Sequence, residues 1–200
     1  MNKIPFVVLI SGRGSNMVAL LEAAAANDYP GRCVQVLSNR PGVAGLDKAA
    51  EFGVATRAID HKTFGKDRES FERSVDAAMR ESGAQFIALA GFMRVLTPWF
   101  VSQWSGRMIN IHPSLLPKYP GLDTHQRAID AGDSEAGCTV HYVTEGVDEG
   151  EIIAQASVPI LPGDTSDTLA TRILPEEHSL YPAALAKALR THAASTPSSG

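Results

Sequence analysis

The sequence predicts an α/β fold: a Rossmann-like, mostly parallel twisted sheet with flanking helices and an antiparallel C-terminal addition. Three observations lead to this expectation. Residues 4–10 (IPFVVLI) form a continuous apolar run that ends in a glycine-rich turn, which is typical of a buried parallel strand. Apolar runs then alternate with helical stretches as far as residue 111, the pattern of repeated β–α units. Beyond residue 137, two strand-like runs follow one another with only a turn between them.

The first part of the chain predicts five strands with helices between them. Residues 67–82 illustrate the helical pattern, because Phe71, Val75, Ala78 and Met79 recur at helical spacing with charged residues on the other face. The expected strands are 4–10, 33–37, 54–58, 85–90 and 107–111. The expected helices are 16–26, 44–52, 67–82 and a short one that begins at Pro98.

The rest of the chain changes character. Residues 113–121 hold three prolines and predict a loop, and residues 124–131 predict a helix. Strands at 138–144 and 152–160 are expected to form a hairpin. A helical region at 165–190 is expected to be interrupted by Pro175 and Pro182. We therefore expect one domain over residues 1–190 and a disordered tail over 191–200.

Composition excludes several classes of protein. The 200 residues are 44% hydrophobic and 20% charged, which is typical of a globular domain. A net charge of −4 argues against a nucleic-acid partner. No window approaches the roughly 18 apolar residues that a membrane span needs. Cys33 and Cys138 belong to no metal-binding pattern and are expected to be buried thiols. We expect a cytoplasmic protein without a bound metal.

The glycine-rich loop Gly12–Asn16 (GRGSN) lies between a buried strand and a helix N-terminus. Backbone amides and the helix dipole favour an anion there, so the loop predicts a phosphate site. A tight turn with an ordinary helix cap remains the alternative. A nicotinamide dinucleotide is disfavoured, because Met17 replaces the third glycine of that fingerprint and no acid follows about 20 residues on.

Asn110 and His112 are two residues apart on an expected strand, so their side chains leave the same face. They lie at the carboxyl end of a parallel strand, where open α/β sheets bind their ligands. An amide that donates to an oxyanion and an imidazole that carries a proton are the pair that acyl transfer needs. The alternative is a histidine satisfied by a local carbonyl beside an asparagine that closes a turn.

The acidic turn at 147–151 is by itself typical of a solvated turn. Its functional interpretation is that one carboxylate, best Asp148, orients His112 and stabilises its charged form. His141 lies on an expected strand and is interpreted as packed.

Three motifs together resemble the phosphoribosylglycinamide formyltransferases, a folate-dependent formyltransferase family. They are Gly12–Asn16, Ala90–Leu96 (AGFMRVL) and Asn110–Gly121 (NIHPSLLPKYPG). The similarity runs from about residue 5 to residue 190. It implies transfer of the formyl group of 10-formyltetrahydrofolate to the amine of phosphoribosylglycinamide in de novo purine (IMP) biosynthesis, with no metal.

The resemblance also implies residue roles. Asn110, His112 and Asp148 would be catalytic. Gly14, Ser15, Asn16 and Glu177 would bind the ribonucleotide. The reduced folate would be bound by Arg68, Met93, Arg94, Val95, Leu96 and Asn110. A weak homodimer is a further expectation.

Other functions are kept as alternatives. A methionyl-tRNA formyltransferase shares the catalytic trio, but it carries a further domain and is disfavoured by the acidic balance. A formyltetrahydrofolate hydrolase would need an additional N-terminal domain. From a different class, a non-catalytic module that binds a phosphorylated metabolite would explain the glycine loop but not the three catalytic-type side chains.

Overall fold

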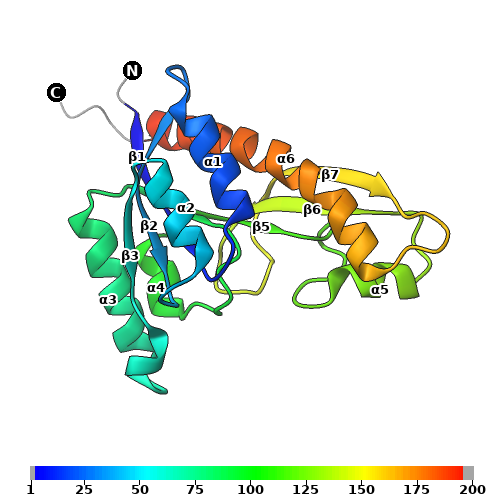
Figure 1. The fold of residues 1–200 in the computed structure, drawn as a ribbon, viewed down its shortest axis with the longest axis horizontal. Helices are drawn as coiled ribbons and strands as arrows, with labels where there is room; N and C mark the ends of the chain where they lie inside the picture. The colour runs from blue at the N-terminus through cyan, green and yellow to red at the C-terminus, as the bar shows by residue number, and fades with distance from the viewer. Residues whose placement is uncertain (1–2, 196–200) are drawn as a thin grey trace.

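The structure, a computed structural model, describes residues 3–195. Its centre is a seven-stranded sheet in the order β3-β2-β1-β4-β5-β6-β7 (Figure 1). The first five strands of the chain run parallel, whereas β6 is antiparallel to β5 and β7 is antiparallel to β6. The predicted mixed sheet is therefore confirmed. The strands are β1 (Ile4–Ile10), β2 (Gly31–Ser38), β3 (Ala55–Ala58), β4 (Phe86–Leu89), β5 (Met108–His112), β6 (Glu135–Tyr142) and β7 (Ile152–Pro159).

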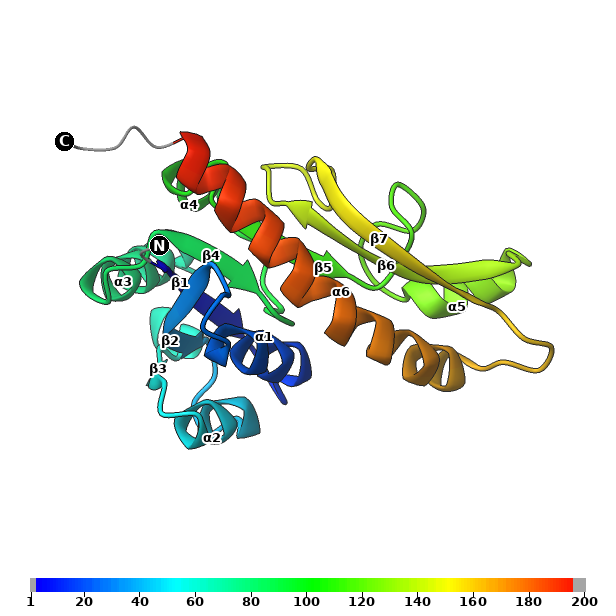
Figure 2. The same cartoon turned by 90° about the horizontal axis from the view of Figure 1, so that it is seen from above.

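Helices cover both faces of the sheet. The described helices are α1 (Ser15–Ala25), α2 (Ala44–Glu51), the 3-10 turn η1 (His61–Phe64), α3 (Arg68–Glu81), α4 (Pro98–Gln103), α5 (Thr124–Asp130) and α6 (Ser166–Ser195). Figure 2 shows α3 on one side of the parallel strands and α1 and α2 on the other. Each predicted helix is present with boundaries within about two residues, except α6.

Side chains on the two faces of β1 belong to two separate hydrophobic cores. Phe6, Val8 and Ile10 pack with residues of α1 and α6, while Val7 and Leu9 pack with residues of α3 and α4. All five side chains are fully buried, as expected for a central strand covered on both faces. This burial fixes the carboxyl end of the sheet, where the polar loops described below meet.

The prediction that α6 is interrupted is wrong, since Pro175 and Pro182 both lie inside one continuous helix. A proline inside a helix costs about 3 kcal/mol through its missing N–H and its ring clash. The buried side chains that α6 presents to the sheet offset that cost, and they are Leu169, Ile173, Tyr181, Leu185 and Leu189.

The last turns of α6 also differ from expectation. Residues 191–195, the first half of the stretch expected to be a disordered tail, are helical. The His192 ring lies edge-on to Phe86 of β4, with ring centroids 5.9 Å apart, which extends the packed face of the helix. Residues 196–200 of the expected tail lie outside the described residues. None of the helices within residues 3–195 is long and apolar enough to cross a membrane.

We expect Tyr181→Phe to lower the free energy of unfolding by about 1–2 kcal/mol. The Tyr181 side chain is fully buried, and its hydroxyl donates to the Leu89 carbonyl oxygen of β4 at 2.8 Å. Urea unfolding measures the change. Tyr142→Phe is the control, because the Tyr142 hydroxyl makes no hydrogen bond within the described part of the chain, and equal losses in the two variants would contradict the role of the Tyr181 bond.

Candidate functional site

The polar face of β5 is the starting point of the site. Ile109 and Ile111 point into the core, whereas Asn110 and His112 leave the opposite face, as strand alternation predicts. The antiparallel register sets Asn110 opposite His141 and His112 opposite Thr139 of β6. Four polar side chains therefore meet on one face of two neighbouring strands.

Asp148 joins the two histidines of this face. Its carboxylate oxygens lie 3.3 Å from His112 Nδ1 and 3.5 Å from His141 Nε2. The Gly121 N–H donates to the same carboxylate at 2.9 Å. The side chain is only 11% exposed, so the acidic turn is not a freely solvated one at this residue. The structure brings together the three residues that the sequence singled out, and adds His141.

The charge of Asp148 is held by these contacts. Burial raises the pKa of its carboxyl group. The hydrogen bonds from His141 and Gly121, together with the positive charges of His112 and His141, outweigh burial and bring the pKa below its ordinary value. The group is thus a carboxylate at neutral pH, suited to orient an imidazole.

Both ring nitrogens of His112 face acceptors. Nδ1 faces the Asp148 carboxylate, and Nε2 lies 3.0 Å from the Tyr119 carbonyl oxygen. A doubly protonated ring would donate on both sides, so the surroundings match the imidazolium form. The alternative interpretation from the sequence was a histidine satisfied by a local carbonyl group. That interpretation holds for Nε2, which contacts the Tyr119 carbonyl oxygen, but it does not account for Nδ1.

His141 is the site residue that sequence reasoning missed. Its side chain is 2% exposed, Nδ1 lies 2.9 Å from the Tyr142 carbonyl oxygen, and Nε2 lies 3.4 Å from Asn110 Nδ2. The Nε2–H donates to the Asp148 carboxylate, so His141 lies between that carboxylate and the Asn110 amide. Only the β5–β6 register, which the sequence does not state, reveals this neighbour.

The glycine loop begins α1. Gly14 has φ +68°, and a Cβ there would lie 3.2 Å from the Gly45 Cα, so the turn requires glycine. Asn16, in the first turn of the helix, donates from Nδ2 to Glu177 Oε2 at 2.6 Å across 161 residues of sequence. The Asn16 Oδ1 atom is buried and has no hydrogen-bond partner within residues 3–195. An unpaired buried acceptor beside a helix N-terminus is suited to a ligand that carries donors and an anionic group.

Glu177 is the buried member of this pair. Burial raises the pKa of its carboxyl group above the ordinary value, and the hydrogen bond from Asn16 offsets part of the rise. Its neighbour Glu176 is exposed, so only one of the two adjacent acids belongs to the site. The structure thereby brings Asn16, Ser15 and Gly14 of one helix end together with Glu177 of α6.

Residues 93–96 form the second predicted binding segment, and α3 holds them. The Arg68 guanidinium donates to the Val95 carbonyl oxygen, and the Arg94 guanidinium lies 5.1 Å from the centre of the Phe71 ring. Glu72, 2% exposed, accepts from the Thr97 N–H at 2.9 Å and from its hydroxyl. Backbone contacts thus fix the segment, while its Met93 and Val95 side chains face solvent and are 67% and 63% exposed.

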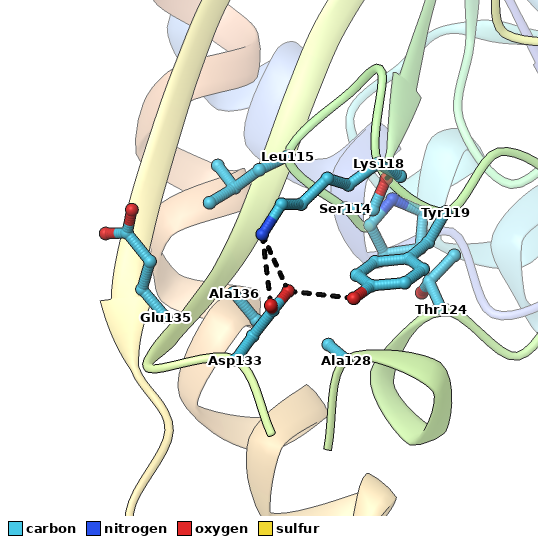
Figure 3. A pocket seen from close by; sticks show the side chains of 10 residues that line it. Ser114, Leu115, Lys118, Tyr119, Thr124, Ala128, Asp133, Glu135 and Ala136 are labelled. Carbon is cyan, nitrogen blue, oxygen red and sulfur yellow. Dashed lines mark hydrogen bonds and ion pairs between the residues drawn. The ribbon is translucent and has the colours of Figure 1, made fainter. Parts of the chain in front are cut away.

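The loop 113–121 is anchored to β6 and to the turn before it. The Thr139 hydroxyl donates to the Ser114 carbonyl oxygen at 2.6 Å. Figure 3 shows the Lys118 ammonium group and the Tyr119 hydroxyl converging on the Asp133 carboxylate beside a small cavity, at 3.0 and 2.9 Å. These anchors set the position of the Tyr119 carbonyl group against His112.

Other reactive groups are accounted for by packing. Both cysteines are free thiols, and burial raises the pKa of each to about 12. Within residues 3–195 there is no group of three or more His, Cys, Asp or Glu side chains that could hold a metal ion.

Asp148→Asn should destabilise the fold in a pH-dependent way. Because the folded pKa of Asp148 is lowered, its contribution is complete above the unfolded pKa of about 4 and is lost as the pH falls through the folded value. We expect a loss of about 1–3 kcal/mol at pH 6 that shrinks below about pH 4. Urea unfolding at several pH values measures it. Asp123→Asn is the matched control, because Asp123 is exposed and makes no side-chain cap hydrogen bond. A loss of unfolding free energy for Asp148→Asn that stays constant with pH would contradict the ionic contacts.

The chain is similar to known proteins over most of its length. Residues 4–185 match the formyl transferase family. The chain is 44% identical over 176 residues to the phosphoribosylglycinamide formyltransferase of Escherichia coli K12. The aligned region covers 88% of this chain and 82% of the relative. The chain is 51% identical over 181 residues to the trifunctional purine biosynthetic protein adenosine-3 of Drosophila pseudoobscura pseudoobscura, a match over 90% of this chain. It spans only 13–18% of the length of that protein and of its homologues from Drosophila melanogaster, Bos taurus, Homo sapiens and Gallus gallus.

Solved structures agree with these matches. The crystal structure of phosphoribosylglycinamide formyltransferase from Brucella melitensis superposes with a TM-score of 0.90 at 50% identity, over 94% of this chain and 96% of that one. Glycinamide ribonucleotide transformylase 1 from Geobacillus kaustophilus gives a TM-score of 0.88 at 39% identity, over 94% of this chain and all of that one. The resemblance seen in the sequence motifs is confirmed, and the chain belongs to the formyl transferase family.

Proposed function

We propose that this chain transfers the formyl group of 10-formyltetrahydrofolate to the amine of N1-(5-phospho-D-ribosyl)glycinamide, giving the N-formyl product and tetrahydrofolate in purine biosynthesis. The observation that carries the proposal is the contact of the Asp148 carboxylate with His112, beside Asn110. These side chains lie at the carboxyl ends of the parallel strands, where the glycine loop and residues 93–96 also begin. The names of the relatives that share the whole domain support the choice of substrates.

In the proposed reaction the substrate amine attacks the formyl carbon directly. A carbon–nitrogen bond forms to the ribonucleotide, the bond from the formyl carbon to N10 of the folate breaks, and one proton passes from the amine to N10. Asn110 would donate to the oxygen that becomes negative. His112, which Asp148 holds through Nδ1, would donate to the same oxygen from Nε2 in place of its contact with the Tyr119 carbonyl oxygen. Losing one such donor typically costs about 3 kcal/mol of transition-state stabilisation.

Two loops would hold the two substrates. Gly14, Ser15 and Asn16 would bind the ribonucleotide phosphate at the start of α1, with Glu177 completing that subsite. The backbone of residues 93–96 would meet the pterin of the folate, and Arg68 would shape this segment through its bond to Val95. Asn110 lies on β5, directly beside β4, whose end leads into residues 93–96.

The remaining expectations belong to the same proposal. The partners would be small molecules only, with neither nucleic acid nor membrane, and the enzyme would act in the cytoplasm without a metal. The weak homodimer stays a prediction.

The experiment is to mix the protein with both substrates and to follow release of tetrahydrofolate. We expect release that requires the ribonucleotide. Release of tetrahydrofolate that does not depend on the ribonucleotide would indicate a hydrolase. Ribonucleotide binding without release of tetrahydrofolate would indicate a binding module. Either result overturns the proposal.

His112→Ala should lower kcat by at least about 100-fold, because the variant loses the imidazole that carries charge next to the transferred group. Ribonucleotide affinity, measured by calorimetry, should stay within about tenfold, which also shows that the variant is folded. Near-normal turnover would remove His112 from the mechanism.

Glu177→Gln should raise the KM for the ribonucleotide by about tenfold, with a smaller effect on the KM for the folate. The change removes the charge that the buried pair with Asn16 offers to the substrate. The exposed neighbour supplies the control, since Glu176→Gln should leave both KM values within about twofold. The assignment fails if the two variants behave alike.

A further inference from the structure

A buried serine–asparagine pair lies where neighbouring strands end. Ser11 directly follows β1 and Asn39 directly follows β2, and their side chains are 4% and 2% exposed. The strand order places β1 between β2 and β4. The residues that follow β4 lead into the segment 93–96. The two polar side chains are therefore buried where the chain enters the glycine loop, and Ser11 lies beside the strand end that leads into the proposed folate segment.

Ser11 bonds to both sides. Its N–H donates to the Gly91 carbonyl oxygen at 3.1 Å, and its hydroxyl oxygen accepts from the Met93 N–H at 2.8 Å. The hydroxyl hydrogen is donated to Asn39 Oδ1 at 2.5 Å. The Ser11 hydroxyl thus accepts a hydrogen bond from the segment after β4 and donates one to the residue after β2.

Asn39 is itself held in place by His61, the first residue of η1, which follows β3. The His61 N–H donates to the Asn39 carbonyl oxygen at 3.2 Å, and His61 Nδ1 lies 2.8 Å from the same oxygen. The ends of β3, β2, β1 and β4 are in this way linked through one chain of polar contacts. Such a chain restricts how far the loops after β1 and β4 can move apart.

We infer that Ser11, held by Asn39, is a positioning residue that fixes residues 93–96 relative to the glycine loop; this inference rests on the proposed function. The glycine loop begins at the residue after Ser11, and Met93 is the first residue of the folate segment. The Met93 side chain is mostly exposed, so packing does not anchor this end of the segment. Ser11 holds the Met93 end, just as Glu72 holds Thr97 beyond the other end. A site held by such supporting bonds loses precision when one of them is removed.

Ser11→Ala tests the inference against a matched control. Ser38→Ala also removes a 2%-exposed hydroxyl at a strand end, but among residues 3–195 the Ser38 hydroxyl accepts only from the Arg40 N–H, at 3.0 Å. We expect Ser11→Ala to raise the KM for the folate about tenfold and to leave the KM for the ribonucleotide within about twofold. Ser38→Ala should leave both KM values unchanged. Equal effects in the two variants, or a rise confined to the ribonucleotide KM, would overturn the inference.

A double variant tests whether Asn39 acts through Ser11. Asn39→Ala should also raise the KM for the folate. The double variant Ser11→Ala with Asn39→Ala should have a folate KM no higher than that of Ser11→Ala alone. Effects that multiply would mean that the two residues act independently, which contradicts the proposed relay.

Two binding measurements separate this inference from the proposed function. Without any turnover, Ser11→Ala should weaken calorimetric binding of tetrahydrofolate about tenfold relative to Ser38→Ala, and should speed amide hydrogen exchange in residues 91–97. A wild-type protein that binds tetrahydrofolate but transfers no formyl group overturns only the function. Unchanged exchange in Ser11→Ala overturns only the positioning role, and a wild-type protein that does not bind tetrahydrofolate overturns both.

Discussion

The Asp148 carboxylate satisfies two buried imidazoles and one backbone N–H, and the site depends on this contact. His112 and His141 are 6% and 2% exposed, so neither ring could be buried there without polar partners. A carboxylate between them supplies those partners from a single side chain. Removing it would take the partner from one nitrogen of each ring and from the Gly121 N–H, which is more costly than the loss of one surface ion pair.

The backbone around this carboxylate is constrained as well. The three non-glycine residues with positive φ among residues 3–195 are Tyr119, Asp123 and Asp148, at 55–57°. Each conformation costs on the order of 1 kcal/mol and persists only where the surroundings impose it. Tyr119 presents its carbonyl oxygen to His112, and Asp148 presents its carboxylate. Two of these strained residues, Tyr119 and Asp148, therefore lie where a group faces His112, and the anchors at Thr139 and Asp133 stabilise the loop that holds Tyr119.

Strand alternation made much of the site predictable. Asn110 and His112 share a face because the side-chain period of a strand is two, and the carboxyl end of a parallel strand is where such a pair meets ligands. The pair formed by Asn16 and Glu177 is different: 161 residues separate them, and only the family resemblance placed Glu177 near the glycine loop. His141 was missed because its role follows from the register of β5 and β6. Ser11 and Asn39 gave no signal, since a serine and an asparagine after a strand are equally typical of ordinary turns.

The one structural expectation that failed concerned α6, and the reason is physical. Proline rules describe a helix that depends on its own hydrogen bonds. In α6 the packing of Leu185, Leu189 and neighbouring side chains on the sheet outweighs the two missing bonds. Local sequence rules thus failed where tertiary contacts outweigh a strong local signal against a helix.

Direct transfer between two bound substrates is the central claim, and a carbon label tests it most directly. Folate carrying ¹³C in its formyl group would be mixed with the ribonucleotide and the enzyme, and the products followed by NMR. Direct transfer predicts that the label appears in the formamide carbon of the ribonucleotide at the rate of tetrahydrofolate release. Labelled free formate as the main product would contradict the account.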